Sequence, residues 1–193
     1  MSYDALINFS GGADSTLALW EWLQANPKRG GKRILVHHCR MTNVQGREKL
    51  ESLAVENILR WLTDRGFDNF DYIESSFGFK TKKNWVQDIE VMGFLTGWAL
   101  RGNEVDRVFI TASAFDFTLP GYEDRAARRF DIVEATAGYK PTYYYPIKDY
   151  SREEIVKKLP KELRPLIWFC RVPNKGKRCT KCVTCQNTIP YLK

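Results

Sequence analysis

Two stretches of the chain carry residues whose types and spacing could do chemistry, and the first is a glycine-containing loop. Its members are Ser10, Gly11, Gly12, Ala13, Asp14, Ser15 and Thr16. The apolar segment before it is typical of a buried strand, and the apolar stripe after it is typical of a helix. Adjacent glycines let the backbone approach a ligand, and a helix N-terminus offers free N–H groups and a positive dipole end. The stretch therefore predicts a phosphate-binding loop.

This loop is not the Walker loop of common nucleotide hydrolases, because no glycine in the chain is followed by four residues and Gly-Lys-Ser/Thr. A plain turn, with Asp14 or Ser15 capping a helix, is the simpler alternative. The pattern Ser-Gly-Gly-x-Asp-Ser resembles the pyrophosphate (PP) loop of the ATP pyrophosphatases, which adenylate a substrate and release pyrophosphate. The resemblance implies that residues 10–16 bind ATP with Mg²⁺, and that Ser10, Asp14 and Ser15 take part in catalysis.

The second stretch is a group of four cysteines in the C-terminal part of the chain. They follow the spacing C-x8-C-x2-C-x2-C and are Cys170, Cys179, Cys182 and Cys185. Four thiolates at this spacing predict a closed tetrahedral Zn²⁺ site, which would hold together a tail too short for a core of its own. An iron–sulfur cluster also takes four cysteines, and redox or persulfide chemistry is a third alternative. The remaining cysteine, Cys39, is interpreted as a small buried residue.

The composition of the 193-residue chain is ordinary for a globular protein. It contains no apolar run of membrane-spanning length and no N-terminal signal pattern, so we expect a cytoplasmic protein without a membrane partner. In that compartment cysteines are more often metal ligands than disulfide partners. The formal net charge of +7 favours anionic partners and leaves direct binding of nucleic acid open.

Strand-like and helix-like segments alternate along the chain. Strands are expected at 5–7, 33–39, 70–74, 107–111 and 142–147, and helices at 17–23, 47–66, 85–100, 123–137 and from 151. This alternation predicts an α/β fold, a parallel twisted sheet with helices on both faces and ligands at the carboxyl ends of the strands. We expect an α/β domain over residues 1–165 and a zinc-binding segment over residues 166–193.

The two histidines of the chain, His37 and His38, are adjacent at the end of the second expected strand. Neighbours in a strand point to opposite faces, so the two side chains cannot act as a pair on one side of the sheet. One of them, for which we take His38, would line the nucleotide site. A structural role is an equally good interpretation of either residue.

Three features in this order resemble the 7-cyano-7-deazaguanine synthase family: the glycine-containing loop, residues 116–124 with Phe130, and the cysteine group. Further matches are Tyr145-Pro146-Ile147 and Arg152-Glu153-Glu154-Ile155, so the resemblance covers nearly the whole chain. It implies a nucleotide-alpha-hydrolase-like, Rossmann-like fold and an ATP-dependent carbon–nitrogen ligase. Such a ligase converts 7-carboxy-7-deazaguanine and ammonia into 7-cyano-7-deazaguanine (preQ0), releasing AMP and pyrophosphate, in a pathway that supplies deazaguanine for tRNA (queuosine) or for modified DNA.

The resemblance also implies which residues contact the deazaguanine. These are Lys83, Asn84, Asp116, Tyr122 and Asp124, with Asp116 also assigned to catalysis. A solvated loop and a helix cap are the alternative roles for Asp116 and Asp124. Ammonia would come free or from a separate protein, and a homodimer is expected.

The sequence departs from the family at three places. Residues 38–46 replace a Tyr-Gly-Gln followed by His, Lys83-Asn84 replaces an Arg-Asn pair, and Thr180 replaces a glycine within the cysteine group. These departures leave open a deazaguanine-activating enzyme with another product or acceptor. Two further alternatives that also share the loop are a PP-loop tRNA-modifying adenylating enzyme and a zinc-stabilised nucleotide-binding module without catalysis.

Overall fold

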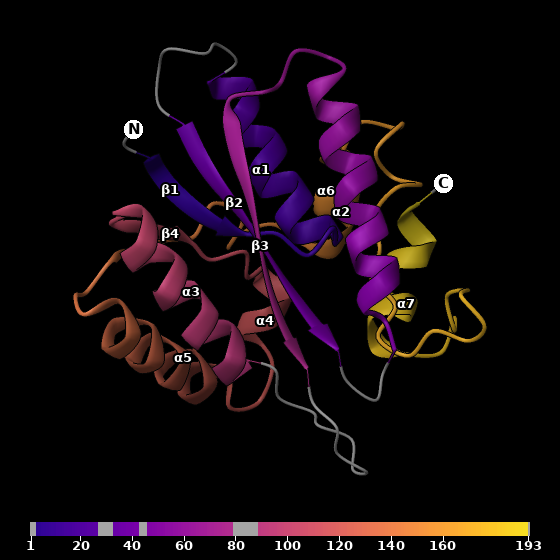
Figure 1. Ribbon diagram of the computed structural model, residues 1–193. Helices are drawn as coiled ribbons and strands as arrows, with labels where there is room; N and C mark the ends of the chain where they lie inside the picture. Colours follow the sequence, from indigo (N-terminus) through magenta and orange to yellow (C-terminus); the bar gives the residue numbers. More distant parts are fainter. Residues whose placement is uncertain (1–2, 27–32, 43–45, 79–88, 193) are drawn as a thin grey trace.

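One parallel sheet organises the chain. The computed structural model describes residues 3–26, 33–42, 46–78 and 89–192. Within them the strands are β1 (Tyr3–Asn8), β2 (Arg33–Thr42), β3 (Phe70–Gly78), β4 (Arg107–Phe109) and β5 (Thr142–Tyr144). Their spatial order is β3-β2-β1-β4-β5, and each neighbouring pair is parallel (Figure 1). The expected α/β fold is confirmed.

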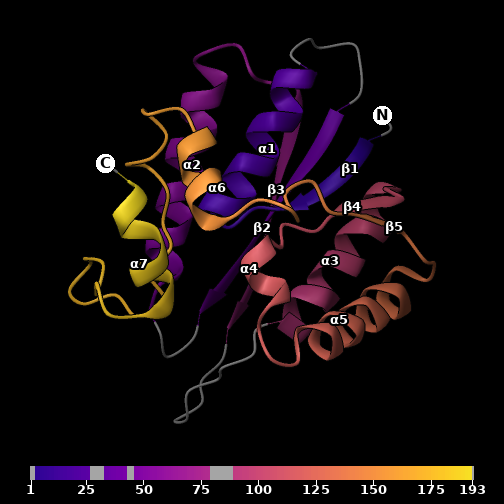
Figure 2. The ribbon, with the colours of Figure 1, turned by 180° about the vertical axis from the view of Figure 1, so that it is seen from behind.

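Helices cover both faces of this sheet (Figures 1 and 2). One face carries α1 (Ala13–Ala25), α2 (Glu48–Thr63) and α6 (Arg152–Lys158), and the other carries α3 (Ile89–Asn103) and α5 (Tyr122–Ala137). The shorter elements are α4 (Ala114–Phe117), α7 (Val183–Thr188) and the 3-10 turn η1 (Ile189–Tyr191). None of the described helices is both long and apolar enough to span a bilayer.

The central strand β1 shows why the sheet is covered on both sides. Ala5 and Ile7 pack into the core beneath α1, α2 and α6, whereas Leu6 packs into the core beneath α3 and α5. All three side chains are fully buried, because successive residues of a strand point to opposite faces and both faces here are covered.

The connections between the strands determine where a ligand binds in such a sheet. The chain runs outward from β1 to β2 and β3, then crosses back to β4 and β5 on the other side of β1. The loops after β1 and β4 therefore leave the sheet in opposite directions and open a crevice at its carboxyl edge.

Several boundaries differ from the expected ones. β2 and β3 run further than predicted because they stay paired as far as Thr42 and Gly78. β4 and β5 are shorter, and the expected loop after β4 contains α4. The start of the helix expected at 85–100 lies outside the described residues, and α3 continues to Asn103.

The helices α3 and α5 approach each other unusually closely at Gly97. A Cβ atom at this position would lie 2.6 Å from both Val133 O and Thr136 Cβ. Real Cβ atoms do not come that near to another heavy atom, so only glycine fits between the two helices at this point. The contact fixes the position of α5 relative to the sheet.

The tail packs on the α1 and α6 side of the molecule. Leu163 and Ile167, which flank the expected domain boundary, are buried in the same core as Ile155 of α6. Tyr191 and Leu192 pack against that core from the end of the described chain. The cysteine segment is therefore seated on the α/β part through apolar contacts.

Candidate functional site

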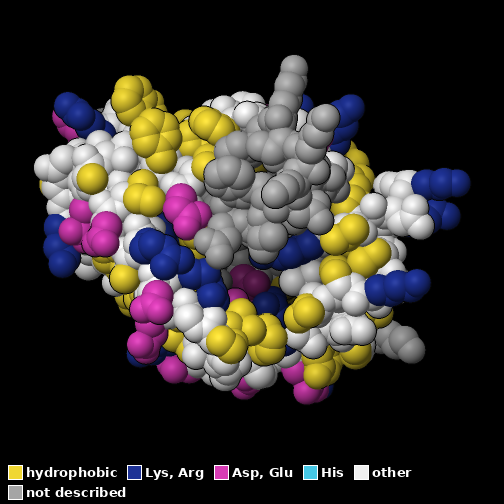
Figure 3. Space-filling view, turned by 90° about the horizontal axis from the view of Figure 1, so that it is seen from below, with side chains coloured by type: hydrophobic (Ala, Val, Ile, Leu, Met, Phe, Trp, Pro, Cys, Tyr) yellow, Lys and Arg dark blue, Asp and Glu magenta, His cyan; other side chains and the backbone are white. Residues whose placement is uncertain are grey.

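A pocket lies at the carboxyl edge of the sheet. It is lined by the loop after β1, the ends of β2 and β4, the first turns of α2, and the tail. Figure 3 looks onto this end of the molecule and shows a hollow with Lys and Arg side chains around it and acidic atoms in its floor. Of the sequence-predicted site residues, it is lined by Ser10, Gly12, Ala13, Asp14 and His38.

The backbone of the loop requires glycine at position 11. Gly11 has φ +71°, in the left-handed region that favours glycine, and a Cβ there would lie 3.0 Å from Ala54 Cβ and 3.1 Å from Val55 N of α2. Gly12 then leads directly into α1 and carries no side chain that could cap the helix. The N–H groups of the first turn of α1 are therefore available to an anion in the pocket.

Hydroxyl groups hold the loop in shape. The Gly12 N–H donates to Ser10 Oγ (3.3 Å), and the Ser10 N–H donates to Ser15 Oγ (3.3 Å). Thr16 Oγ1 donates to the Gly12 carbonyl at 2.6 Å. Ser15 and Thr16 are buried, whereas Ser10 is exposed, so only the Ser10 hydroxyl is open to a ligand.

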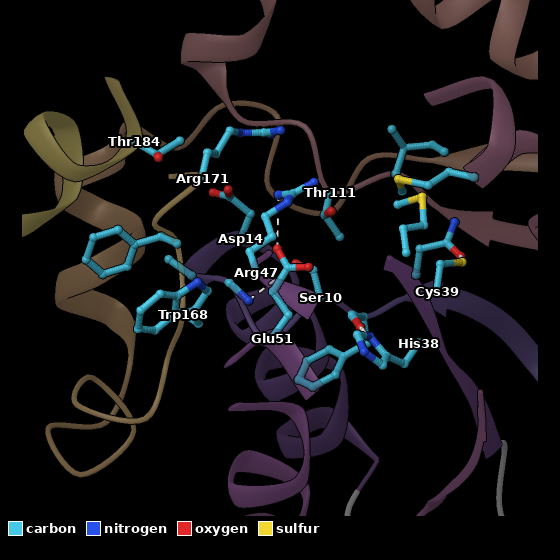
Figure 4. A pocket seen from close by; sticks show the side chains of 18 of the residues that line it. Ser10, Asp14, His38, Cys39, Arg47, Glu51, Thr111, Trp168, Arg171 and Thr184 are labelled. Carbon is cyan, nitrogen blue, oxygen red and sulfur yellow. Dashed lines mark hydrogen bonds and ion pairs between the residues drawn. The ribbon is translucent and has the colours of Figure 1, made fainter. Parts of the chain in front are cut away.

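The carboxylate of Asp14 is paired with an arginine from a distant part of the chain. Arg152 Nη1, at the start of α6, lies 2.5 Å from Asp14 Oδ1. A second pair, Arg47 and Glu51 at 3.0 Å, lies on the first turn of α2. Figure 4 shows Ser10, Asp14, Arg47 and Glu51 lying together, with Trp168 and Thr184 reaching the pocket from the tail.

Four arginines line the pocket, and they were not predicted as site residues. They are Arg47, Arg129, Arg152 and Arg171, contributed by four separate segments. The acidic side chains among the described lining residues are Asp14 and Glu51, so the pocket has a surplus of positive charge. A cleft of one sign of charge concentrates ions of the opposite sign, which here means an anionic ligand. Arg152 was noted only as part of a motif of the resemblance.

The two histidines lie on opposite sides of β2, as expected from their adjacency. His38 lines the pocket, and its ring contacts Phe9 O (2.9 Å) and Ser52 Oγ (3.1 Å). His37 Nε2 lies 2.9 Å from Ser75 Oγ. Burial lowers the pKa of both rings, that of His37 to about 4. Both are therefore neutral at physiological pH.

The predicted deazaguanine contacts do not line this pocket as far as the structure describes them. Asp116 Oδ2 accepts bonds from the N–H and the hydroxyl of Ser113, both at 2.8 Å, and so caps α4. Asp124 is exposed on the first turn of α5. These are the alternative roles that the sequence left open for both carboxylates. Lys83 and Asn84 lie outside the described residues.

Tyr122 differs from these two carboxylates, because its polar group has no partner within the described residues. Its ring packs against Phe117 with centroids 4.8 Å apart. Its hydroxyl oxygen is buried and makes no hydrogen bond within the described residues, and burial raises the pKa of Tyr122 to about 12. A buried hydroxyl without a partner is costly, and a ligand could satisfy it.

The four cysteines of the tail converge. The Sγ atoms of Cys170, Cys179, Cys182 and Cys185 all lie within 4.8 Å of one another. The Cys179 N–H donates to Cys170 Sγ (3.2 Å), and the Cys182 N–H donates to Cys179 Sγ (3.3 Å). Bonds from the backbone amides of Lys181 and Cys182 lower the pKa of the Cys179 thiol, which favours the thiolate form that a metal binds. The cluster can therefore hold a metal.

The tail is bonded directly to the glycine-containing loop. The Trp168 N–H donates to the Gly11 carbonyl at 2.8 Å. Two residues further on, Cys170 begins the cysteine cluster, and Arg178 Nη2 donates back to Ile167 O at 2.8 Å. A short stretch of chain thus connects the cysteine cluster to Trp168, the residue that bonds the glycine-containing loop.

Comparison with known proteins finds similarity in the fold but not in the sequence. No protein-family model and no curated protein matches the sequence. The structure is similar to that of the U34-tRNA thiolase NcsA from Methanococcus maripaludis with its [4Fe-4S] cluster, with a TM-score of 0.57 and 10% identity, over 92% of this chain and 61% of that chain. A universal stress protein in complex with cAMP gives a TM-score of 0.41 at 12% identity, over 76% of this chain and 98% of that chain.

The match to the thiolase supports a conclusion about the fold only. The chain spans 61% of the thiolase's length, and at 10% identity the similarity concerns the fold alone. The chain therefore shares the α/β fold of that thiolase, and its glycine-containing loop lies directly after β1.

Proposed function

We propose that the protein is an ATP-dependent enzyme that adenylates a substrate oxygen and releases pyrophosphate. The observation that supports this best is the meeting of an uncapped helix N-terminus with several arginines in one pocket. The amides at the start of α1 would bind the β- and γ-phosphates, and Arg152 and Arg171 would approach them from α6 and the tail. Mg²⁺ bound to the nucleotide supplies further neutralisation of phosphate charge.

The proposed chemistry is an in-line displacement at the α-phosphorus. A substrate oxygen forms a bond to this phosphorus while its bond to the oxygen that bridges to the β-phosphate breaks. The negative charge that develops then lies on pyrophosphate, where the amides and guanidinium groups are already oriented. Asp14 pairs with Arg152 at 2.5 Å and would fix that guanidinium on the leaving group.

The first candidate acceptor is the carboxylate of 7-carboxy-7-deazaguanine, and its support is the set of sequence motifs. A carboxylate is a poor electrophile, and adenylation converts it into a mixed anhydride whose leaving group is AMP. Ammonia would attack the carbonyl carbon, lose a proton and give the amide. Adenylation of the amide oxygen by a second ATP, followed by loss of AMP and a proton, would give the nitrile.

The second candidate acceptor is a base of tRNA, whose carbonyl oxygen would be adenylated before another nucleophile replaces it. The fold similarity to a U34-tRNA thiolase supports this candidate better than the first. The net charge of +7 agrees with an RNA partner. Both candidates share the ATP site and the release of pyrophosphate, so they differ only in what enters the pocket beside ATP.

For the cysteine cluster we propose a single Zn²⁺. Four thiolates about 2.3 Å from one zinc ion lie about 3.8 Å from each other, and Cys179 Sγ and Cys185 Sγ are 3.9 Å apart. A four-iron cluster binds each cysteine at a different iron and spreads the sulfur atoms further. A closed four-thiolate zinc site has no open position, so its role would be to fold the tail beneath the loop.

The test is product analysis. Zinc-loaded protein is incubated with ATP, Mg²⁺ and ammonium, either with 7-carboxy-7-deazaguanine or with unmodified tRNA, and pyrophosphate, AMP and products are measured by mass spectrometry. Formation of the amide or nitrile with AMP supports the first acceptor, and an ATP-dependent mass change in tRNA supports the second. ATP binding without pyrophosphate release in either mixture would contradict the proposed enzyme class.

A further inference from the structure

The positive charge of the chain is concentrated in residues 163–193, which form the tail. No Asp or Glu follows Glu162, whereas seven of the 30 Lys and Arg residues do. Residues 1–162 therefore hold 23 charged residues of each sign, and the tail alone accounts for the formal net charge of +7. One Zn²⁺ with four thiolates, as proposed above, carries two negative charges, so five positive charges of the tail stay uncompensated. The tail is thus the part of the chain that attracts anions.

The basic residues of the tail fall into two groups. Arg164 Nη2 donates to Lys157 O at 2.9 Å, and Arg178 Nη2 donates to Ile167 O at 2.8 Å, so both hold the fold of the segment. Four others are exposed, and we call them the basic patch: Arg171, Lys175, Lys177 and Lys181. Every ion pair between described residues has both members before residue 163. The basic patch therefore has no counter-ion within the described residues.

A tight turn presents two lysines of the patch. Asn174 and Lys177 exchange two backbone hydrogen bonds of 2.9 Å and enclose Lys175 and Gly176. The φ angles of Lys175 and Gly176 are +48° and +76°, as in a two-residue turn of type I′. A positive φ is uncommon for lysine, and the exposed Lys175 side chain has no ion pair within the described residues that would compensate for it. Such a backbone conformation points to a function for this side chain at the surface.

The cysteine cluster keeps the patch on one compact segment. The Sγ atoms of Cys170 and Cys182 lie within 4.8 Å of each other, although eleven residues separate them in the sequence. All four cations of the patch belong to these eleven residues, so the chain that carries them is closed into a loop at its base. Lys and Arg side chains project at the far right of Figure 3, the side on which Figure 1 places this loop.

The basic patch and the pocket share a residue. Arg171 belongs to the patch and also lines the pocket, on the same side as Thr184 of α7 (Figure 4). The pocket itself has a surplus of positive charge. Several separate cations beside such a pocket suit an anion with repeated charges, a polymer of phosphates, better than a single phosphate group.

A nucleic acid fits this patch better than an anionic membrane does. A segment that binds a membrane surface buries the apolar face of a helix among the lipid headgroups. The helix of the tail, α7, has only six residues, and the large apolar side chains exposed on the described tail are Val172 and Val183. RNA is favoured over duplex DNA, because a base must leave its stack to enter the pocket and the loops of a folded RNA already present unstacked bases.

We infer that the basic patch is a docking surface for the phosphate backbone of a folded RNA, which holds an unstacked base of this RNA at the pocket. The inference rests on the proposed function and deepens it, since it favours the second candidate acceptor and gives the tail a part in binding it. Lys175, Lys177 and Lys181 supply charges for phosphates outside the ATP site, and Arg171 lies where patch and pocket meet. Phosphate contacts of this kind position a substrate without reading its sequence.

The test measures RNA binding in the absence of ATP. Fluorescence anisotropy gives the affinity of the metal-loaded full chain for a labelled, unmodified tRNA between about 50 and 200 mM salt, and for a DNA duplex with the same number of phosphates. The affinity for tRNA should fall by at least about 10-fold over this range, as three or more phosphate contacts require. At each salt concentration tRNA should bind at least about 3-fold more tightly than the duplex, because its loops present unstacked bases.

A triple variant locates the docking surface. Lys175→Gln with Lys177→Gln and Lys181→Gln removes three charges of the patch and leaves every lining residue of the pocket unchanged. Binding of tRNA at about 100 mM salt should weaken by about 10- to 100-fold, and its dependence on salt should become less steep. Affinity for α,β-methylene-ATP, which cannot release pyrophosphate, should stay within about 3-fold of that of the wild-type protein, because the proposed ATP site is intact.

A second triple variant is the matched control. Arg101→Gln with Lys140→Gln and Lys161→Gln removes the same amount of charge from exposed positions outside the tail. Its affinity for tRNA should stay within about 3-fold of that of the wild-type protein, since the patch rather than the net charge makes the contacts. Metal analysis and thermal unfolding show whether the tail of each variant is folded.

Four results would overturn the inference. They are an affinity for tRNA that does not change with salt, equal affinity for tRNA and the duplex, equal losses of tRNA binding in the two triple variants, and tighter binding to vesicles containing phosphatidylserine than to tRNA, which would assign the patch to a membrane. None of them concerns ATP, so the proposed function would stand with its first candidate acceptor. Binding of tRNA by a protein that does not bind α,β-methylene-ATP would instead contradict the proposed function and leave the docking surface in place.

Discussion

The two loops that border the pocket use their polar groups differently. After β1, the Gly11 carbonyl is bonded to Trp168 of the tail, and Asp14 is paired with Arg152 of α6. After β4, Asp116 is bonded to Ser113 within its own short helix, and the Tyr122 hydroxyl has no hydrogen bond within the described residues. The loop after β1 is thus held by distant parts of the chain, whereas the segment after β4 is held mainly by itself.

This difference shows on which side of the pocket the polar groups are already bonded and positioned. The glycine-containing loop needs only a ligand, because its amides, hydroxyls and arginines are in place. On the other side, within the described residues, the Tyr122 hydroxyl makes no hydrogen bond and Arg129 has no ion pair. The two carboxylates expected to contact substrate lie in the first turns of α4 and α5. Nucleotide binding should therefore respond to changes far from the loop, and changes in the segment after β4 should stay local.

The largest expected effect concerns the distant support of the loop. Cys185→Ser removes a buried cysteine of the cluster, and we expect loss of the proposed Zn²⁺ and unfolding of the tail, since a structural metal supplies folding free energy to such a segment. Affinity for ATP should fall by at least about 10-fold, because Trp168 then no longer orders Gly11. Metal analysis and calorimetry measure both. Cys39→Ser, outside the cluster, should keep its metal, and stoichiometric metal in Cys185→Ser would contradict the ligand set.

A decrease in pH should lower the free energy of unfolding through His37, in the strand next to β1. His37 is fully buried, and its pKa is about 4 against an ordinary 6.5, so between these values the unfolded chain binds a proton that the folded chain does not. Stability is therefore highest above pH 6.5 and falls as the pH decreases toward 4, by about 3 kcal/mol for this group. Urea unfolding at several pH values measures it. His37→Gln should flatten the curve, and an unchanged slope would assign the effect to other groups.

Two aspartates provide a matched comparison of the loops. Asp14→Asn should slow pyrophosphate release by about 100-fold, the scale of losing one oriented charge-stabilising group, because Arg152 is no longer held in place. Asp116→Asn weakens a helix cap and should cost about 1 kcal/mol of stability with less than about 10-fold loss of activity. Steady-state pyrophosphate assays and thermal unfolding separate the two. Equal losses of activity would show that Asp116 contacts substrate.

The close approach of α3 and α5 fixes the wall that carries Arg129. Gly97→Ala would place a methyl group 2.6 Å from atoms of α5, and we expect a loss of about 2 kcal/mol of stability. Gly102→Ala, in the same helix, meets nothing within 4 Å and should be neutral or stabilising by up to about 1 kcal/mol. Chemical unfolding of the pair measures the difference. Similar values for both variants would mean that the helices can separate without cost.

The smallest effect should come from the cysteine segment. Thr180 has φ +60°, in the left-handed region that β-branched residues avoid, at the position where the resembling family has glycine. Thr180→Gly should therefore stabilise the metal-bound tail by about 1 kcal/mol. Competition with a chelator and thermal unfolding measure it. A lower metal affinity in this variant would show that the Thr180 side chain has a role of its own.

The sequence predicts those features that neighbouring residues determine. The alternation of strands and helices follows from hydrophobic periodicity, and the loop and the cysteine cluster each lie in one short run of residues. The pocket arginines escape prediction because Arg47, Arg129, Arg152 and Arg171 come from four segments that only the folded sheet brings together. A local signal was available for Asp116, because Ser113 precedes it at the spacing of a capping box.

The bond from Trp168 to Gly11 also has a consequence for the order in which the protein becomes active. A ribosome completes the glycine-containing loop early, but the backbone partner of that loop is translated only after all five strands. The segment that carries the partner leads into the cysteine cluster, which can hold a metal ion. With the proposed Zn²⁺ as the anchor of that segment, a nascent or metal-starved chain should possess the sheet without a fully ordered nucleotide site, and the supply of metal would limit how much newly made protein binds the proposed nucleotide.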